Sequence, residues 1–288
     1  MLGVIFMKTK IFVSSSTSID QATHSYSITI IPDIITIDGE IYEDTKQMSP
    51  ESFCNRIKYD DSSLIKISHQ NFEYIDNLYK QTKAQGYTDY LFILSPYEYD
   101  MEDDLNKLKE QYNDDNIVIY KSNVASFLLA LMVIEADKSL KNQVPMKKVI
   151  EMLDNMSLES IGGIRIFKET ETELISPFDS SILNTKSAGE SYIWSNHQFV
   201  MIGKSSKKRD KDANPFKAFI RSFFEKTEGL NIQPVLLYST KNTAYLNYLR
   251  DMIKSIYPKL KSIKEIALAP RIQLEIKNGL GIAYLSKM

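Results

Sequence analysis

YLFILS, at residues 90–95, is a continuous apolar run of strand length that ends in a serine. A strand that is apolar on both faces is typical of the interior of a parallel sheet, where helices cover both sides. An amphipathic segment, Phe72–Gln85, precedes it and is stopped by Gly86. An acidic segment, Met101–Tyr112, follows it. The sequence therefore predicts helix, strand and helix around a buried central strand.

The same alternation continues on both sides of this unit. KIFVS at residues 10–14 reads as a strand that runs into a serine-rich loop, IVIY at 117–120 as another strand, and VASFLLALMVIEAD at 124–137 as a helix. A further helix is expected over Met146–Met156. The sequence thus predicts an N-terminal α/β domain, residues 1–160, with a parallel sheet flanked by helices.

Turn and cap signals lie between the first strand and the first helix. The segment SITIIPDIITIDGEIY at residues 27–42 has β-branched residues on both sides of Pro32, and Asp38-Gly39 predicts a tight hairpin turn. Pro50 after Ser49 predicts the start of a helix that runs to about Lys58.

The second half of the sequence has a different pattern of predicted strands and helices, and Gly162-Gly163 are expected at the boundary between the two domains. Short strands are expected at 164–167, 192–194, 199–202, 234–239 and 281–286, and helices at 215–226 and 244–257. This pattern predicts a C-terminal α+β domain over residues 161–288.

Composition excludes several classes of function. Lys and Arg number 35 and Asp and Glu 37, so a net charge of -2 argues against a nucleic-acid partner. One thiol, Cys54, and three scattered histidines predict no metal site, and no cofactor motif is present. No apolar run reaches the roughly 18 residues of a membrane span, so we expect a cytoplasmic protein without an integral membrane segment.

Several segments, taken in order, resemble the DegV family of fatty-acid-binding proteins. The most specific is IIPDIITIDGEIYED at residues 30–44, which ends in Asp38, Gly39, Glu40, Tyr42 and Asp44. The other matches are IFVSSSTSID at 11–20, the Ser-Pro-x-x-Phe helix start at 49–53, the loop at 67–70, FILS at 92–95 and GLGIAYL at 279–285.

The resemblance implies both a fold and a function. It implies that the C-terminal domain has a mainly antiparallel sheet with helices, and that a long-chain fatty acid or similar lipid lies in a tunnel between the domains. It further implies a carrier, not an enzyme, that presents the bound acyl group to a separate fatty acid kinase. Ser68 and Ser95 stand where the family places its head-group donors. Ser16 and Thr17 are second candidates, and His69 is a third kind of candidate because it could replace a missing imidazole.

The chain departs from the family pattern at several positions. Ser15 stands for an aspartate, Ile67 for a threonine and Leu274 for a histidine, and acidic residues at 98–103 replace a Ser-Gly-Thr-Tyr motif. A degenerate structural or regulatory protein that has lost fatty-acid binding is therefore the alternative. An enzyme that transfers phosphate through His24, His69 or His197 rests on fold analogy alone.

Other residues have an ordinary structural interpretation beside a functional one. Serine and threonine at strand ends also cap helices and turns. The acidic stretch at 98–104 is interpreted as charge at a helix N-terminus. Four apolar residues could line a lipid tail or belong to the core: Phe127, Leu128, Leu131 and Met132. Four basic residues could dock a partner or form a solvated loop: Lys204, Lys207, Lys208 and Arg209.

Overall fold

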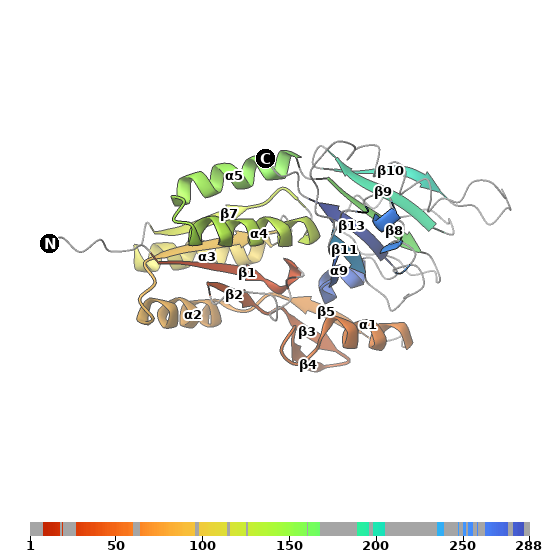
Figure 1. Ribbon diagram of the computed structural model, residues 1–288. Helices are drawn as coiled ribbons and strands as arrows, with labels where there is room; N and C mark the ends of the chain where they lie inside the picture. The colour runs from red at the N-terminus through yellow and green to blue at the C-terminus, as the bar shows by residue number, and fades with distance from the viewer. Residues whose placement is uncertain are drawn as a thin grey trace.

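A computed structural model gives the fold as three sheets with helices packed against them (Figure 1). The residues that it describes are 8–17, 19, 27–59, 64–95, 98–113, 116–124, 126–159, 161–167, 189–195, 198–204, 235–238, 247, 250–251, 253–255, 258, 263–275 and 279–284.

The first sheet is parallel throughout, with strand order β2-β1-β6-β7. Its strands are β1 (Thr9–Ser14), β2 (Ile28–Ile31), β6 (Asp89–Leu94) and β7 (Ile117–Lys121). Every residue of β6 is buried, and β6 lies inside the sheet between β1 and β7. The interior strand expected from YLFILS is confirmed, because an all-apolar strand needs cover on both faces.

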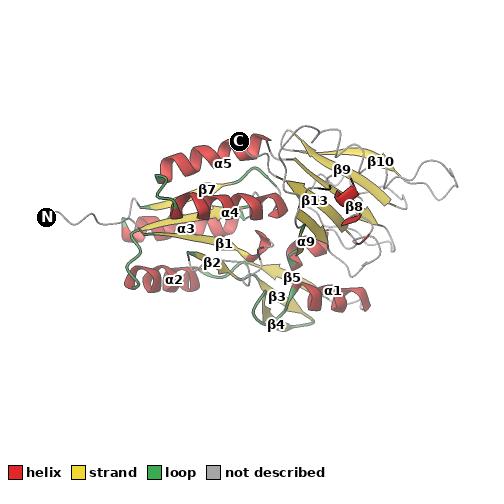
Figure 2. Ribbon diagram, in the orientation of Figure 1, coloured by secondary structure: helices red, strands yellow, loops and turns green. Residues whose placement is uncertain are grey.

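Helices α4 (Ser126–Lys141) and α5 (Met146–Glu159) cover one face of this sheet (Figure 2). Side chains alternate between the two faces of a strand. Ile11 and Leu91 of β1 and β6 therefore point to the same side and share a core cluster with residues of both helices, such as Leu129.

The opposite face is covered by α2 (Phe72–Ala84) and α3 (Tyr99–Tyr112). Phe12 and Phe92, the next residues along β1 and β6, stack on this side with ring centroids 4.5 Å apart. Gly86, with φ of +81°, follows α2 and supplies the left-handed backbone that stops it. The sheet is thus a layer between two pairs of helices.

A small antiparallel sheet with order β4-β3-β5 is formed by the part of the chain between β2 and β6. It contains β3 (Ile34–Ile37), β4 (Glu40–Glu43) and β5 (Ile65–Ser68), and helix α1 (Pro50–Tyr59) packs beside it. Asp38 and Gly39 have φ of 51° and 89°, as a tight hairpin turn requires, which confirms the predicted hairpin.

The C-terminal sheet has six strands in the order β10-β9-β8-β13-β11-β12. All neighbours are antiparallel except β11 and β12. The strands are β8 (Ile161–Phe167), β9 (Gly189–Ser195), β10 (Gln198–Lys204), β11 (Val235–Tyr238), β12 (Lys264–Ala267) and β13 (Gly279–Tyr284). The expected α/β fold class, with a parallel N-terminal and a mainly antiparallel C-terminal sheet, is confirmed.

Two details of the second half differ from the sequence analysis. Gly162 and Gly163 lie inside β8, where they pair with β9 and β13, and not in a linker. A short helix, α9 (Pro270–Glu275), was not anticipated. The helix expected at 215–226 and most of that at 244–257 lie outside the described residues, and the domain boundary stays a prediction.

Helix α9 connects the C-terminal part to the N-terminal part (Figure 1). It contacts α1 and the turn η1 (Ser15–Thr17) that follows β1. The side-chain amide of Gln273 donates to the carbonyl of Pro50 at 2.8 Å. Among the described residues, no helix combines the length and apolarity needed to cross a membrane.

Candidate functional site

Buried hydroxyl groups gather where β1 and β6 end. Ser14 is the last residue of β1, Ser16 lies in the turn η1, and Ser95 follows β6. The carboxyl ends of adjacent parallel strands meet at one edge of the sheet, which is where ligands of open α/β sheets bind. The exposed fractions of Ser14, Ser16 and Ser95 are 0%, 1% and 2%, so these residues need hydrogen-bond partners inside the protein.

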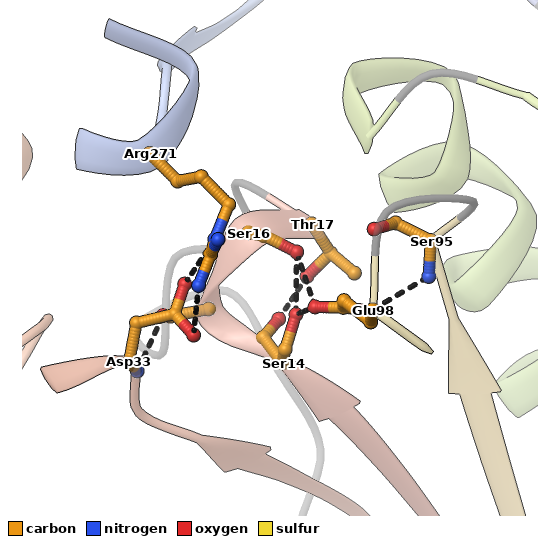
Figure 3. Close-up of polar contacts among 8 residues, drawn as sticks. Ser14, Ser16, Thr17, Asp33, Ser95, Glu98 and Arg271 are labelled. Carbon is orange, nitrogen blue, oxygen red and sulfur yellow. Dashed lines mark hydrogen bonds and ion pairs between the residues drawn. The ribbon is translucent and has the colours of Figure 1, made fainter. Parts of the chain in front are cut away.

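The carboxylate of Glu98 lies between the hydroxyls of Ser14 and Ser16 and the backbone N–H of Ser95 (Figure 3). Ser16 Oγ donates to Glu98 Oε1 at 2.7 Å, and Ser14 Oγ donates to the same oxygen. The backbone N–H of Ser95 donates to Glu98 Oε2 at 2.7 Å. Glu98 is only 6% exposed. Burial raises the pKa of Glu98, and the charge of Asp33 raises it further, while the three hydrogen bonds oppose the change.

A second buried carboxylate, Asp33, joins the N-terminal part to α9. Arg271 donates from Nε to Asp33 Oδ2 at 3.1 Å and from Nη2 to Oδ1 at 3.3 Å, a bidentate pair. The backbone N–H of Asp33 donates to Ser15 Oγ at 2.9 Å. Asp33 is 1% exposed, and the Arg271 side chain is 23% exposed. The pair therefore fixes α9 against the loop between β2 and β3.

A third carboxylate, Asp44, follows β4 and is 0% exposed. Neither of its oxygens has a hydrogen bond of normal geometry within the described part of the chain. The Ser15 hydroxyl and the Thr45 N–H lie close enough to favour its charged form. Burial outweighs them and, with the nearby charge of Asp33, raises the pKa of Asp44 to about 7. Three buried carboxyl groups therefore accompany the Arg271 guanidinium.

The expected site residues Ser16, Thr17 and Ser95 meet at this cluster, which we call the serine–carboxylate cluster, consisting of Ser14, Ser15, Ser16, Thr17, Asp33, Asp44, Ser95, Glu98 and Arg271. Thr17 Oγ1 donates to the carbonyl of Ser14 at 2.8 Å, so its hydroxyl stabilises the turn. A ligand-binding role of the three expected residues stays a prediction.

The other two expected residues, Ser68 and His69, lie at the end of β5. Ser68 pairs with Ile34, the residue after Asp33, and is half-buried. His69 Nε2 lies 3.5 Å from Asp104 Oδ2 of α3, on a partly exposed surface. His69 thus has an acidic neighbour, Asp104, outside the serine–carboxylate cluster.

Ile67 and Leu274, which differ from the family pattern, lie against one apolar cluster. Both are partly buried and pack against Ile35, Ile37, Met48 and Phe53. Leu274 belongs to α9 and Ile67 to β5, so residues far apart in sequence contribute to the same apolar contact.

Sequence reasoning missed the acceptors and the cation of the cluster. The acidic stretch that begins at Glu98 was interpreted as helix N-terminal charge. Glu98 is indeed the N-cap of α3, but its side chain makes no cap hydrogen bond and turns to Ser14 and Ser16 instead. Its position three residues after Ser95 was the available signal. Nothing local pairs Asp33 with Arg271, because 238 positions separate them.

Other candidates from the sequence have no part in this cluster. Leu131 and Met132 pack in the core between the parallel sheet and α4 and α5. Lys204 ends β10. The side chains of Phe127 and Leu128, together with His24, His197, Lys207, Lys208 and Arg209, lie outside the described residues. Within the described residues, no group of three or more metal-binding side chains is suitably placed for an ion.

Comparison with solved structures shows the fold of the whole chain. A fatty-acid-binding DegV family protein from Thermus thermophilus has a TM-score of 0.80 at 14% identity, over 98% of this chain and 100% of that one. A stearic acid-binding protein from Eubacterium ventriosum has a TM-score of 0.80 at 15% identity, over 97% of this chain and 98% of that one.

A third similar structure is the Fatty Acid Kinase (Fak) B3 protein of Streptococcus pneumoniae, loaded with linoleic acid. Its TM-score is 0.74 at 12% identity, over 98% of this chain and 100% of that one. No curated protein matches the sequence. The sequence profile of the DegV family, described as uncharacterised proteins, matches residues 8–162, more than half of the 288 residues. The chain therefore belongs to the DegV family.

Proposed function

We propose that this protein binds a long-chain fatty acid or a similar single-chain lipid where the parallel sheet faces the C-terminal part. Membership of the DegV family supports the proposal. Solved structures of the same fold include a fatty-acid-binding protein, a stearic acid-binding protein and a protein loaded with linoleic acid. In this proposal the protein is a cytoplasmic carrier that performs no catalysis itself and presents its lipid to a separate fatty acid kinase.

The serine–carboxylate cluster is the observation that carries the proposal. It is a buried polar group at the carboxyl edge of a parallel sheet, next to α9 of the C-terminal part (Figure 3). A lipid needs a polar end of this kind for its head and apolar surroundings for its tail, which contributes about 0.8 kcal/mol per buried methylene. The tail would supply affinity, and Ser16, Thr17, Ser95 and, beside them, Ser68 and His69 would orient the head.

Lipid content and lipid uptake test the proposal directly. Native mass spectrometry of freshly purified protein should detect a bound lipid, and delipidated protein should take up a fluorescent acyl probe in a saturable manner. Ser16→Ala should weaken uptake by about threefold to tenfold, the usual effect of one lost hydrogen bond. Ser52→Ala, on the exposed side of α1, is the matched control and should leave uptake unchanged.

The proposal fails if no acyl ligand binds saturably and no lipid accompanies the fresh protein. One observation favours the alternative of a DegV-family protein that has lost lipid binding. Ile67 and Leu274, which stand for polar residues of the family pattern, both pack against the apolar cluster around Phe53. A structural or regulatory role would then explain the same measurements.

A further inference from the structure

Head-group recognition in the serine–carboxylate cluster depends on which hydrogen-bonding groups its own residues leave free. Ser14 and Ser16 both donate their hydroxyl protons toward Glu98. The N–H of Ser95 donates to the other oxygen of Glu98. Thr17 donates to the carbonyl of Ser14. These donors are therefore already engaged by groups of the protein itself.

Acceptors, in contrast, remain available. Each ionised carboxylate offers about four acceptor positions. Glu98 uses two at Oε1 and one at Oε2. Asp44 is 0% exposed, and neither of its oxygens receives a hydrogen bond of normal geometry within the described residues, although the Ser15 hydroxyl and the Thr45 N–H lie close by. Asp44 lies in the same cluster, because its charge interacts with those of Asp33 and Arg271.

Charge gives an independent argument. The carboxyl groups of Asp33, Asp44 and Glu98 are buried together, and the Arg271 guanidinium is engaged in a bidentate pair with Asp33. A ligand carboxylate placed beside the ionised carboxylate of Glu98 would add a like charge to this buried group, which costs free energy. A head group that brings its own donor proton would instead meet free acceptors.

We propose that the lipid bound by this protein has an uncharged head group that donates a hydrogen bond, such as a hydroxyl or a primary amide, and that Glu98 excludes an ionised fatty acid. This inference rests on the proposed lipid-binding function and narrows its ligand. Glu98 takes the place of a ligand carboxylate among Ser14, Ser16 and Ser95 (Figure 3). The inference keeps the lipid-binding part of the proposed function and replaces presentation to a fatty acid kinase, because a lipid of this kind has no carboxylate to phosphorylate.

Three ligands with the same hydrocarbon chain separate charge from donor capacity. Hexadecanol is uncharged and donates, methyl hexadecanoate is uncharged without a donor, and hexadecanoate is anionic at mildly alkaline pH. Each competes with a fluorescent fatty alcohol on delipidated protein. Hexadecanol should bind tightest, and hexadecanoate about tenfold or more weaker, the equivalent of one pKa unit of like-charge interaction.

Glu98→Gln tests the residue that is responsible. Glutamine keeps the size of the side chain, removes the charge and offers an amide N–H to a carboxylate. The affinity for hexadecanoate should rise about tenfold, while that for hexadecanol changes by less than about threefold. Glu102→Gln is the matched control, because Glu102 lies one turn further along α3 and pairs with Lys121 on the surface. It should leave the order of the three ligands unchanged.

Wild-type protein gives a second readout that needs no substitution. Lowering the pH neutralises hexadecanoate, so its affinity should approach that of hexadecanol. Hexadecanol is measured in parallel as a control for titration of the protein itself, because Asp33, Asp44, Glu98 and Arg271 all face the cluster. Hexadecanoate or its methyl ester binding as tightly as hexadecanol at alkaline pH overturns this inference and leaves lipid binding in place. Binding of none of the three ligands overturns the proposed function itself.

Discussion

Replacing Arg271 by leucine should destabilise the protein strongly, because it leaves Asp33 as a buried, unpaired carboxylate. Asp33 is 1% exposed and receives two hydrogen bonds from Arg271, at 3.1 and 3.3 Å. Removal of one partner of a buried ion pair costs about 3–5 kcal/mol. The Arg271 side chain is 23% exposed, so water screens part of the interaction. We expect Arg271→Leu to lower the free energy of unfolding by about 2–4 kcal/mol.

Urea unfolding measures this loss with two probes. Trp194, the single tryptophan, lies on β9 and reports on the C-terminal sheet, while far-ultraviolet circular dichroism reports on all helices and strands. Arg250→Leu is the control, because Arg250 pairs with Glu265 at 30% and 28% side-chain exposure and should cost at most about 1 kcal/mol. The double variant Asp33→Asn/Arg271→Leu should recover part of the loss. Equal midpoints for the two arginine variants would refute the role assigned to this pair.

Two further predictions concern Asp44 and Leu274. The folded protein raises the pKa of Asp44 from 3.8 to about 7, so its protonated form favours folding and stability falls as the pH rises between these values. Asp44→Asn should flatten that fall and stabilise the protein by up to about 4 kcal/mol at higher pH. Urea titrations at several pH values measure the free energy of unfolding, and an unchanged dependence of this free energy on pH would contradict the prediction. Leu274→His should cost about 1–3 kcal/mol in the same assay, because it brings a polar ring against Phe53, and it should not increase hexadecanoate binding while Glu98 is retained.

Local sequence signals predicted most of the N-terminal fold because the relevant physics is local. The apolar residues 90–94 of β6 predicted an interior strand, and Asp38-Gly39 could adopt the positive φ of a hairpin turn. The parallel pairing of β2 with β1 could not be predicted from the sequence in the same way. Pro32 separates β2 from the hairpin that follows, and the short β2 carries no signal that names its neighbour in the sheet. Sheet order depends on contacts between distant segments, and no local pattern encodes them.

The candidate site was predictable on its donor side only. Ser95 was expected from the resemblance to the DegV family and Ser16 from its place on the neighbouring loop, and the structure brings both to one edge of the parallel sheet. Their hydrogen-bond partner, Glu98, could not be predicted from the sequence. An acidic residue at the start of a helix has an ordinary electrostatic role, and only the geometry reveals that Glu98 turns away from the helix N-terminus to accept from Ser14 and Ser16.

The departures from the family pattern are physically consistent with one another. Ile67 and Leu274 lie in an apolar contact with Phe53, where a threonine or histidine would leave polar atoms without water. The loss of hydrogen-bond donors at those positions would weaken binding of a ligand carboxylate. It would not weaken binding of a ligand whose head group is itself a donor. Glu98 adds an acceptor among hydroxyls that would otherwise hold such a carboxylate. A simple closure of the site would need only the apolar changes, and it gives no reason to bury a carboxylate at a cost in free energy. The buried carboxyl group of Glu98 is thus the feature that separates an altered ligand preference from a lost one.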